Sequence, residues 1–445
     1  MDKILYLIIK LVVAFSRIAK VLGKIGIGSY DEWEKGKKLK VLLVGYNGAR
    51  NTGSDVRVIT IARQVKELFG ADNVQITVMT LDTDNLQGYF DEDVTLLKFS
   101  SLFPIPLYKA CSSHHVAILC EGSTLKSTFA NALTLFLCEA AGIMRMQNKP
   151  CIAFGSEVGR LDPFMEKAAK DLCRDAYFIT RTKGSYRALQ KLGLKGHSGT
   201  DAAWLYEGAI DADSADEMLR SKGWDGEKKL LGIAVINPFC WPVRPSLYKW
   251  IKGMITGNLS GQYDKWYFFS ESLSREKAYK RYIRQVANAV NAFAGNGEYY
   301  PVIIGMEKLD ATACKDLRKE LYTESAMFLS GDYSADIMTG ILRRLSMLVT
   351  SRYHASVLSL EKGCPVIAIS MDERLNGILK ELKLDDKYLF RTSDAEFGDR
   401  LHTSLMNADS DSLDIHEHIS KALIHYKEKQ REMGLFMKQF IQDRL

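Results

Sequence analysis

Residues 345–370 read LSMLVTSRYHASVLSLEKGCPVIAIS, and this stretch decides the fold. Two apolar runs in it, Ser346–Thr350 and Pro365–Ile369, have the length and composition of buried strands. The residues between them, Tyr353–Glu361, have the composition of a short helix. A strand, a helix and a second strand in this order predict one βαβ unit, in which the two strands are parallel.

Arg352 and His354 follow the first of these strands and stand at the start of the helix. In open α/β sheets, ligands bind at the carboxyl ends of the strands. A helix N-terminus also offers free N–H groups and a positive dipole to an anion. We therefore predict an anion site with a titratable group at this position, formed by Arg352 and His354. The alternative is that the histidine only caps the helix or packs against it.

The same alternation of strands and helices continues on both sides of this unit. Further strands are expected at Lys40–Val44, Val74–Met79, Val116–Leu119, Cys151–Phe154, Tyr177–Thr180, Leu230–Ile236, Trp266–Phe269 and Tyr300–Ile304. Further helices are expected at Val56–Phe69, Ala130–Met146, Pro163–Cys173, Arg275–Phe293, Thr312–Thr323 and Ile415–Leu445. The pattern predicts an α/β protein with two Rossmann-like, doubly wound domains facing a cleft, which resembles the GT-B architecture.

The chain is too long for one ordinary core, so we expect several parts. Residues 1–37 are a basic amphipathic helix and a linker, and residues 38–208 form the first Rossmann-like domain. A polar linker leads to the second Rossmann-like domain, residues 229–414. Residues 415–445 are a long C-terminal helix with no strand after it.

The composition of the 445 residues is that of a globular protein, with 47% hydrophobic residues, 26% charged residues and a net charge of +6. This charge is small for the length, and no zinc-finger, RNP or basic-zipper pattern occurs, so nucleic acid is not expected as a partner. Mild basicity fits an anionic small substrate or an anionic membrane surface. The eight cysteines contain no C-x-x-C pair, which predicts free thiols in a reducing compartment and no metal site.

The N-terminal segment, residues 3–24, reads KILYLIIKLVVAFSRIAKVLGK. On a helix its cations form one basic stripe: Lys3, Lys10, Arg17, Lys20 and Lys24. Lys10 interrupts the apolar run, so a membrane-spanning helix is not expected. We predict a helix lying in an anionic membrane interface and a cytoplasmic protein that is peripheral on the inner face of the cell membrane. The alternative is a helix packed on the protein's own body or on a second protomer of a homo-oligomer.

The loop after the first strand contains Gly48, Asn51, Gly53 and Asp55. Gly48 and Gly53 have the spacing of a Walker A loop, but no lysine follows, so a nucleoside triphosphate is not indicated. The loop still predicts substrate binding, because its backbone N–H groups suit a phosphate or a carboxylate. A tight turn that needs glycine for its conformation is the alternative.

Polar residues follow three other strands at the same edges of the two sheets. Glu121 and Ser123 follow one strand, Arg181 directly follows another, and Asp372 and Arg374 follow the strand that closes the βαβ unit. We predict that these residues bind substrate. The alternatives are a helix cap by Ser123 and a salt bridge from Arg181 to Asp201.

These pieces together resemble the polysaccharide pyruvyl transferase family. The family's first loop is matched by Gly45, Tyr46, Gly48, Asn51 and Gly53. Its middle segment is matched by Arg181, Ser185, Leu189, Leu192, Gly193 and Asp201. Its Arg-x-His and Gly-x-Pro signature is matched by Arg352, Tyr353, His354, Gly363 and Pro365. The family's usual acidic pair reads Ser54-Asp55 here, and its usual glycine run reads Glu121-Gly122-Ser123.

The resemblance implies transfer of pyruvate from phosphoenolpyruvate to sugar hydroxyls as a ketal, with release of phosphate and without a cofactor. The acceptor would be a cell-surface polysaccharide or its lipid-linked precursor. The resemblance places the acceptor on the side of the first domain and the donor on the side of the second. Arginines then hold the donor, His354 is the general acid, and Asp55 or Glu121 is the base.

Two other functions stay open at this point. One is a GT-B glycosyltransferase that uses a nucleotide sugar, although no acidic residue in the second domain is clearly placed for a ribose. The other is a catalytically silent, membrane-associated member of the family, against which the presence of Arg352 and His354 speaks.

Overall fold

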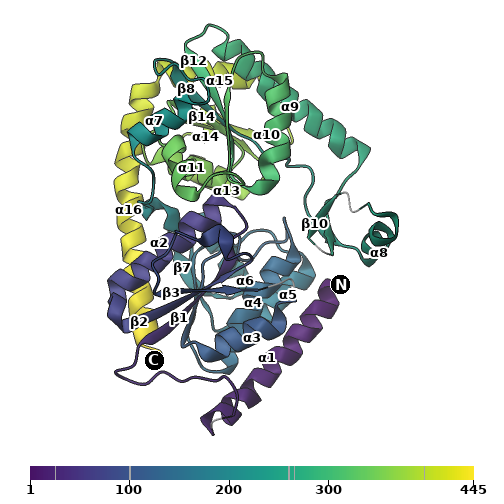
Figure 1. Cartoon of the computed structure of the whole chain (residues 1–445), viewed down its shortest axis with the longest axis vertical. Coiled ribbons are helices and arrows are strands. Elements are labelled where there is room, and N and C mark those ends of the chain that lie inside the picture. The colour runs from purple at the N-terminus through teal and green to yellow at the C-terminus, as the bar shows by residue number, and fades with distance from the viewer. Residues whose placement is uncertain (26, 100–101, 259–260, 265, 395) are drawn as a thin grey trace.

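The computed structural model describes residues 1–25, 27–99, 102–258, 261–264, 266–394 and 396–445. Two parallel sheets, each covered by helices, lie one above the other, and a small antiparallel sheet stands beside them (Figure 1). The predicted α/β class with two doubly wound, GT-B-like sheets is therefore confirmed.

The first unit is a seven-stranded parallel sheet in the order β3-β2-β1-β4-β5-β6-β7. Its strands are β1 Leu39–Asn47, β2 Val74–Thr80, β3 Val94–Lys98, β4 Val116–Leu119, β5 Cys151–Ser156, β6 Tyr177–Thr180 and β7 Lys195–Ser198. Its helices are α2 Thr52–Phe69, α3 Pro104–Ser113, α4 Asn131–Met146, α5 Pro163–Leu172 and α6 Lys183–Leu192. The strand order reverses between β1 and β4, which is where open sheets of this kind bind ligands.

The second unit repeats this design with six parallel strands in the order β13-β12-β8-β14-β15-β16. Its strands are β8 Lys229–Ala234, β12 Tyr299–Gly305, β13 Ala326–Leu329, β14 Met347–Thr350, β15 Val366–Ser370 and β16 Leu389–Arg391. Its helices are α7 Ala212–Arg220, α9 Leu273–Ala294, α10 Ala311–Glu320, α11 Ala335–Leu342, α12 Tyr353–Leu360, α13 Glu373–Glu381, α14 Asp385–Tyr388 and α15 Gly398–Ser410. The predicted βαβ unit is β14–α12–β15, with β8 and β14 at the point where the order reverses.

The central strands are apolar on both faces because helices cover both sides of each sheet. In β1, Leu42 and Val44 belong to the core on one face, and Val41 and Leu43 belong to the core on the other. All four side chains are fully buried. This two-sided burial explains why the strands read as continuous apolar runs rather than as alternating patterns.

The strand expected at Trp266–Phe269 does not join the second sheet. Instead β9 Arg244–Pro245, β10 Gln262–Asp264 and β11 Tyr267–Phe268 form a small antiparallel sheet that carries α8 Leu247–Thr256. The aromatic residues that suggested a core strand pack against one another, as Trp250 does against Trp266 with ring centroids 4.3 Å apart. Aromatic content alone therefore does not distinguish a core strand from a small local cluster.

The C-terminal helix α16, Ser412–Gln442, runs along the edge of both units (Figure 1). Its first half packs on the core of the second unit through Ile419 and Leu423. Its second half packs on the core of the first unit through Met433 and Met437. One helix therefore joins the two units through apolar burial.

The two units also touch directly at the base of the space between them. The N–H of Thr52 donates to the carbonyl of Met306 at 2.9 Å, and the N–H of Lys308 donates to the carbonyl of Arg50 at 3.2 Å. These bonds form an antiparallel bridge between Asn51 and Glu307. We call this contact the floor bridge.

Helix α1, Asp2–Lys24, packs on α3 and α4 of the first unit through Ile9, Val13 and Ala19. The helix that the sequence predicted is therefore present, and one of its faces lies on the protein's own body. Within the described part of the chain, no helix combines the length and hydropathy that a membrane span needs.

Candidate active site

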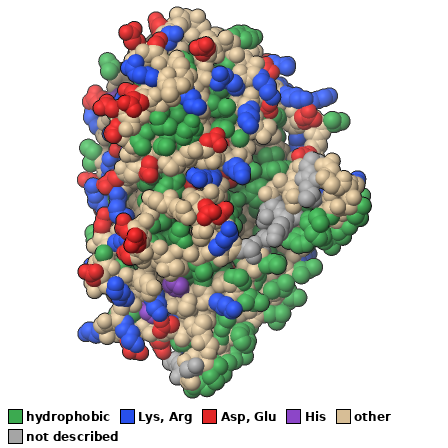
Figure 2. Space-filling model, viewed as in Figure 1, with side chains coloured by type: hydrophobic (Ala, Val, Ile, Leu, Met, Phe, Trp, Pro, Cys, Tyr) green, Lys and Arg blue, Asp and Glu red, His purple; other side chains and the backbone are tan. Residues whose placement is uncertain are grey.

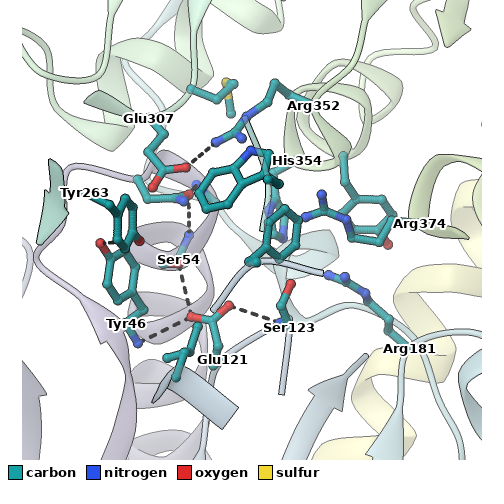
Figure 3. A pocket seen from close by; sticks show the side chains of 18 residues that line it. Tyr46, Ser54, Glu121, Ser123, Arg181, Tyr263, Glu307, Arg352, His354 and Arg374 are labelled. Carbon is teal, nitrogen blue, oxygen red and sulfur yellow. Dashed lines mark hydrogen bonds and ion pairs between the residues drawn. The ribbon is translucent and has the colours of Figure 1, made fainter. Parts of the chain in front are cut away.

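A pocket lies between the two units above the floor bridge, at the carboxyl ends of β1 and β4 of the first sheet and β12, β14 and β15 of the second (Figure 3). Its lining comprises Tyr46, Asn51, Gly53, Ser54, Glu121, Gly122, Ser123, Phe129, Leu133, Arg181, Trp241, Tyr263, Met306, Glu307, Arg352, Tyr353, His354 and Arg374. Eight of the residues predicted from the sequence are therefore brought together: Asn51, Gly53, Glu121, Ser123, Arg181, Arg352, His354 and Arg374.

Arg352 is held at the start of α12 by two carboxylates. Its Nη2 lies 2.8 Å from Oε2 of Glu307, and its Nε lies 3.1 Å from Oδ2 of Asp310. Burial raises the pKa of Asp310 to about 7, against the opposing effect of the guanidinium. Two nitrogens of Arg352 are thus occupied, and the start of α12 has no side-chain cap. The backbone N–H groups at this helix end are available for an anion.

The ring of His354 is largely enclosed, with 16% of the side chain exposed, and its Nε2 lies 3.5 Å from Oδ2 of Asp201. Burial lowers the pKa of His354 to about 4, and the neighbouring cations Arg181 and Arg57 act in the same direction, against Asp201. The imidazole is therefore neutral at pH 7 in the free protein. The sequence predicted the position of this group but not its protonation state.

Asp201 anchors a buried cluster behind His354. Its Oδ1 lies 2.8 Å from Nη1 of Arg57, and its Oδ2 lies 3.1 Å from Nη1 of Arg181. Burial alone would raise the pKa of Asp201, but the two arginines and His354 hold it well below its usual range. The carboxylate therefore stays ionised and fixes the side chains around it.

Arg181 both lines the pocket and forms the salt bridge to Asp201, the two arrangements that the sequence left open. It bridges Asp201 and also Glu157, whose Oε2 lies 2.8 Å from Nε. Its guanidinium also stacks over the ring of Tyr353, at 4.3 Å from the centroid. Its remaining nitrogen, Nη2, is buried and has no hydrogen-bond partner among the described residues. Arg181 lines the pocket with only 1% of its side chain exposed, so its positive charge acts there from an enclosed position.

Arg374 is oriented by Asp372. Nε of Arg374 lies 2.9 Å from both carboxylate oxygens, and Nη2 lies 2.8 Å from Oδ2. Lys126, which is fully buried, contacts the same carboxylate at 3.2 Å. The prediction that Asp372 binds substrate is corrected: it caps α13 and holds Arg374 from behind the lining.

In the loop after β1, the backbone N–H groups of residues 52–55 at the start of α2 are already used. The N–H groups of Gly53 and Ser54 donate to Oδ1 of Asn51, the N-cap of α2, and the N–H of Asp55 donates to the carbonyl of Asn51. The N–H of Thr52 is used in the floor bridge. The predicted anion-binding loop is therefore corrected to a capped helix start, because Asn51 already satisfies these donors.

Gly48 and Asp55 also lie behind the lining and do not reach the pocket. Gly48 has a φ of +72°, and a Cβ there would collide with Thr80 and Asp82, so the turn itself requires glycine. Asp55 is 2% exposed, and burial raises its pKa to about 7. Gly48 and Asp55, predicted to bind substrate, therefore lie outside the pocket lining.

Glu121 is the carboxylate of the first unit that faces the pocket (Figure 3). Its Oε1 accepts the N–H of Ser123 at 3.1 Å. Its Oε2 accepts the N–H of Tyr46 at 3.3 Å and the hydroxyl of Ser54 at 3.4 Å. These donors fix the carboxylate in one orientation at the end of β4.

An aromatic wall, which sequence reasoning missed, closes one side of the pocket: Tyr46, Phe129, Trp241 and Tyr263. The ring of Trp241 lies 5.0 Å from that of Phe129 and 5.7 Å from that of Tyr263. The hydroxyl of Tyr263 donates to that of Tyr46 at 3.0 Å. Trp241 and Tyr263 belong to the segment around the small antiparallel sheet. No local sequence pattern predicts that this sheet packs against the first unit.

No group of three or more His, Cys, Asp and Glu side chains within the described ranges is arranged to hold a metal ion. Besides its hydroxyl, amide and indole groups, the pocket contains three guanidinium groups, an imidazole and two carboxylates. Such a set can bind an anion, carry a proton and orient a hydroxyl group.

Comparison with solved structures shows the fold. The chain is 12% identical to the Anabaena protein Alr3699/HepE, crystallised with UDP-glucose, with a TM-score of 0.56 over 91% of this chain and 100% of that one. It is 10% identical to the UDP-GlcNAc 2-epimerase of Methanocaldococcus jannaschii, with a TM-score of 0.51 over 83% of this chain and 92% of that one. It is also 10% identical to MnaA of S. aureus, determined with UDP, with a TM-score of 0.52 over 86% and 91%.

No curated protein sequence is significantly similar to the chain. The model of one family, described as polysaccharide pyruvyl transferase, matches residues 51–373. This range is more than half of the chain and includes Arg181, Arg352 and His354. The chain therefore belongs to the polysaccharide pyruvyl transferase family and is a transferase.

Proposed function

We propose that the protein transfers the pyruvate unit of phosphoenolpyruvate to hydroxyl groups of a cell-surface saccharide, free or linked to a lipid, as a ketal. The observation that carries this proposal is the pocket at the start of α12, where Arg352 and His354 face Arg181, Arg374 and Glu121. The family to which the chain belongs supports the reaction class.

The three arginines of the pocket suit a donor with a phosphate and a carboxylate. Each guanidinium is held by carboxylates on two of its nitrogens, which fixes its plane. Among the contacts of the described residues, Nη2 of Arg181, Nη1 of Arg352 and Nη1 of Arg374 have no carboxylate partner. Fixed guanidinium donors of this kind bind phosphate and carboxylate oxygens better than flexible lysines do.

His354 supplies the proton in this scheme. The imidazole is neutral in the free protein, and the negative charge of a bound donor would favour its protonated form. Transfer of that proton to the terminal CH₂ carbon of phosphoenolpyruvate makes a methyl group and leaves the central carbon electrophilic. Two acceptor hydroxyl oxygens bond to this carbon, and the bond to the phosphate oxygen breaks. Of the two hydroxyl protons, one replaces the proton lost by His354 and the other leaves with phosphate.

Glu121 is the base that fits the geometry. It faces the pocket, whereas Asp55, the other base considered from the sequence, does not. Where the resemblance expects the first acid of a pair, this chain has Ser54, whose hydroxyl donates to Glu121. A carboxylate is therefore present at that place, although it comes from β4. Its Oε1 and Oε2 are aligned by backbone donors and can accept a proton from an acceptor hydroxyl.

The aromatic wall supports a saccharide acceptor. Faces of aromatic rings pack well against the C–H groups of sugar rings, since both are apolar surfaces of similar size. Nε1 of Trp241 is buried and has no hydrogen-bond partner among the described residues. The wall and Glu121 border the same pocket, which would bring an acceptor hydroxyl and its base together.

Thermal unfolding with added ligands tests the donor. Millimolar phosphoenolpyruvate should raise the melting temperature, because a ligand that binds only the folded protein stabilises it. Pyruvate and inorganic phosphate, which each carry one half of the donor's charge groups, are matched controls and should shift it less. A clear shift with UDP-glucose and none with phosphoenolpyruvate would favour a nucleotide-sugar glycosyltransferase. Donor binding without release of phosphate from any saccharide acceptor would favour a silent family member.

A further inference from the structure

We propose that α1, α3 and α8 together form a docking face for an anionic lipid bilayer. This docking face goes beyond the predicted basic helix, because it joins a helix of the first unit to the small antiparallel sheet of the second half of the chain. It consists of the outward apolar side of α1, Ile105 on α3 and the outward apolar side of α8.

Helix α1 is apolar on two opposite faces. One face is buried on α3 and α4. The other face is exposed over its whole length, with each of these side chains between 51% and 65% exposed: Ile4, Leu7, Leu11, Phe15, Ile18 and Val21. A helix that needed only to cover the protein's core would be polar on its outer face. Contiguous exposed apolar surface of this extent marks an interaction site.

Helix α8 carries a second exposed apolar side. Gly253 is its one buried residue, and its exposed large side chains are Leu247, Tyr248, Ile251, Met254 and Ile255. Their spacing of three and four residues places them along one side of the helix. The helix is held to its own small sheet by Trp250 against Trp266.

Helix α1 contacts both α3 and the small sheet that carries α8. The hydroxyl of Tyr267, in the small sheet, donates to Oδ1 of Asp2 at the start of α1 at 3.3 Å. Farther along α1, the ring of Phe15 lies 5.9 Å from that of Tyr108 on α3. Figure 2 shows hydrophobic side chains gathered along the edge of the molecule where Figure 1 places α1 and α8. The exposed apolar sides therefore belong to one surface.

The charges around this surface match anionic lipid headgroups. Residues 3–30, 99–120 and 241–263 include no aspartate or glutamate, and they contain α3, α8 and all of α1 except its first residue, Asp2. Exposed cations are present on each helix: Lys3, Lys10, Arg17, Lys109, Lys249 and Lys252. Of these, Lys10 also lies 3.7 Å from Asp171 of α5. Apolar side chains flanked by Lys and Arg are typical of helices in a membrane interface, where the cations meet the headgroups. A second copy of the chain is disfavoured as the occupant, because two such faces would oppose cation to cation.

The docking face borders the aromatic side of the pocket. Asp2 also accepts the amide of Asn131, which is two residues from Phe129 and from Leu133 in the pocket lining. The segment that carries α8 begins after Trp241 and ends at Tyr263, both in the aromatic wall. A bilayer bound to α1 and α8 would therefore lie beside the wall that we assign to the acceptor. This last step rests on the proposed function, whereas the docking itself does not.

Co-sedimentation of the full-length protein with lipid vesicles tests the docking face. Vesicles of phosphatidylcholine with 30% phosphatidylglycerol should bind the protein at least tenfold better than vesicles of phosphatidylcholine alone, and added salt should weaken the binding. Two variants each remove one apolar side, L7Q/L11Q/I18Q on α1 and Y248S/I251S/I255S on α8. Each should lower the partition coefficient at least tenfold, since both sides contact the bilayer.

The matched control is L413Q/I424Q/L435Q, which replaces equally exposed apolar residues of α16 on the opposite edge of the molecule. It should bind vesicles like the wild type. Unchanged melting temperatures would show that the variants fold. The proposal is overturned if the wild type does not bind anionic vesicles, or if the control and the α8 variant lose binding equally. A dimer in solution that the α1 variant dissociates, without vesicle binding, would assign the face to a second copy. None of these measurements uses donor or acceptor, so their failure leaves the proposed transfer reaction untouched.

Discussion

The imidazole of His354 occupies the space that a Cβ on residue 53 would need. A Cβ built on Gly53 would overlap Nδ1 and Cγ of His354, closer than real atoms approach. Gly53 belongs to the first turn of α2, and His354 to the first turn of α12, so two helix ends from different units meet at this point. Residue 53 must therefore be a glycine to leave room for the imidazole of His354, and phosphate binding is not needed to explain it.

Replacing Gly53 with alanine should lower the transfer rate by about 10²-fold, because it moves the imidazole by an ångström or more and misplacement on this scale is costly. The folded state should not lose stability through the backbone, since alanine is favoured over glycine within a helix by about 1 kcal/mol. Steady-state rates and the melting temperature of the variant measure both effects. Gly184→Ala on α6, where a Cβ meets only Thr182 at 3.7 Å, is the matched control and should keep normal activity.

His354→Gln and Arg352→Lys should separate the proton from the donor contact. His354→Gln should lower turnover by about 10²–10⁴-fold, the usual effect of losing a general acid, while donor affinity changes little. Arg352→Lys keeps the charge but loses the planar donor pair, so donor affinity should fall by roughly 1.5–3 kcal/mol. Turnover and donor affinity should be measured on both. Near-normal turnover of the His354 variant would remove the histidine from the proposed mechanism.

Arg352→Ala is a poorer variant for this purpose. It would leave the buried carboxylates of Glu307 and Asp310 without their cation, and removing one partner of a buried ion pair typically costs about 3–5 kcal/mol of stability. We expect its melting temperature to fall well below that of Arg352→Lys.

Donor binding should take up a proton at His354. The pKa of this group is about 4 in the free protein, and a bound anion raises it, so the complex holds more protons than the free protein between the two values. Donor affinity should therefore weaken as the pH rises through the pKa of the complex. Calorimetry in buffers of different ionisation enthalpy measures the proton count. His354→Gln should remove this uptake and leave only the donor's own titration, and equal uptake in both proteins would contradict the assignment.

Glu139 should make stability depend on pH without affecting the reaction. It is fully buried on α4, neither carboxylate oxygen has a hydrogen-bond partner in the described ranges, and burial raises its pKa to about 8. The unfolded chain ionises near the ordinary value of 4.5, so the contribution of Glu139 to folding stability is most favourable below that pH and is lost as the pH rises to about 8. Each pH unit in this window can cost about 1.4 kcal/mol.

Glu139→Gln mimics the protonated carboxyl group and should flatten this decline. Melting temperatures at pH 5 and pH 8 measure it. Glu428→Gln, at an exposed position on α16, is the control and should keep the pH dependence of the wild type. Equal slopes for the wild type and the Glu139 variant would mean that the carboxyl group is solvated.

Strong local patterns predicted the sheets and the centre of the site. The runs around β14 and β15 are buried on both faces, so their apolar character is continuous and easy to recognise. Arg352 and His354 could be placed because a parallel strand and its following helix put them at one edge of the sheet. Glu307 and Asp310, whose carboxylates hold Arg352, follow β12. The order of the chain alone does not show that these carboxylates lie within hydrogen-bond distance of Arg352.

Other features depend on packing between distant segments. The sequence does not show whether the side chain of Asn51 caps α2 or leaves its first N–H groups free. The structure shows that the side chain accepts from these N–H groups. Trp241 and Tyr263 reach the pocket because they contact Phe129 and Tyr46, respectively. In each contact the two residues are more than 100 positions apart in the sequence. The low pKa of His354 follows from its enclosure between two units, and sequence gives no measure of enclosure.

The floor bridge limits how the two units can move. Its two backbone bonds join Arg50 and Thr52 to Lys308 and Met306 beside the pocket, and α16 crosses between the units along one edge. A sliding motion would break these bonds, whereas a rotation about a line through them would not. The small antiparallel sheet adds a further tie on the side away from α16 (Figure 1), because the N–H of Val243 donates to the carbonyl of Phe129 at 2.9 Å and the hydroxyl of Tyr263 donates to that of Tyr46. Any rotation that widens the pocket on that side must therefore break these contacts or carry the small sheet along with the first unit.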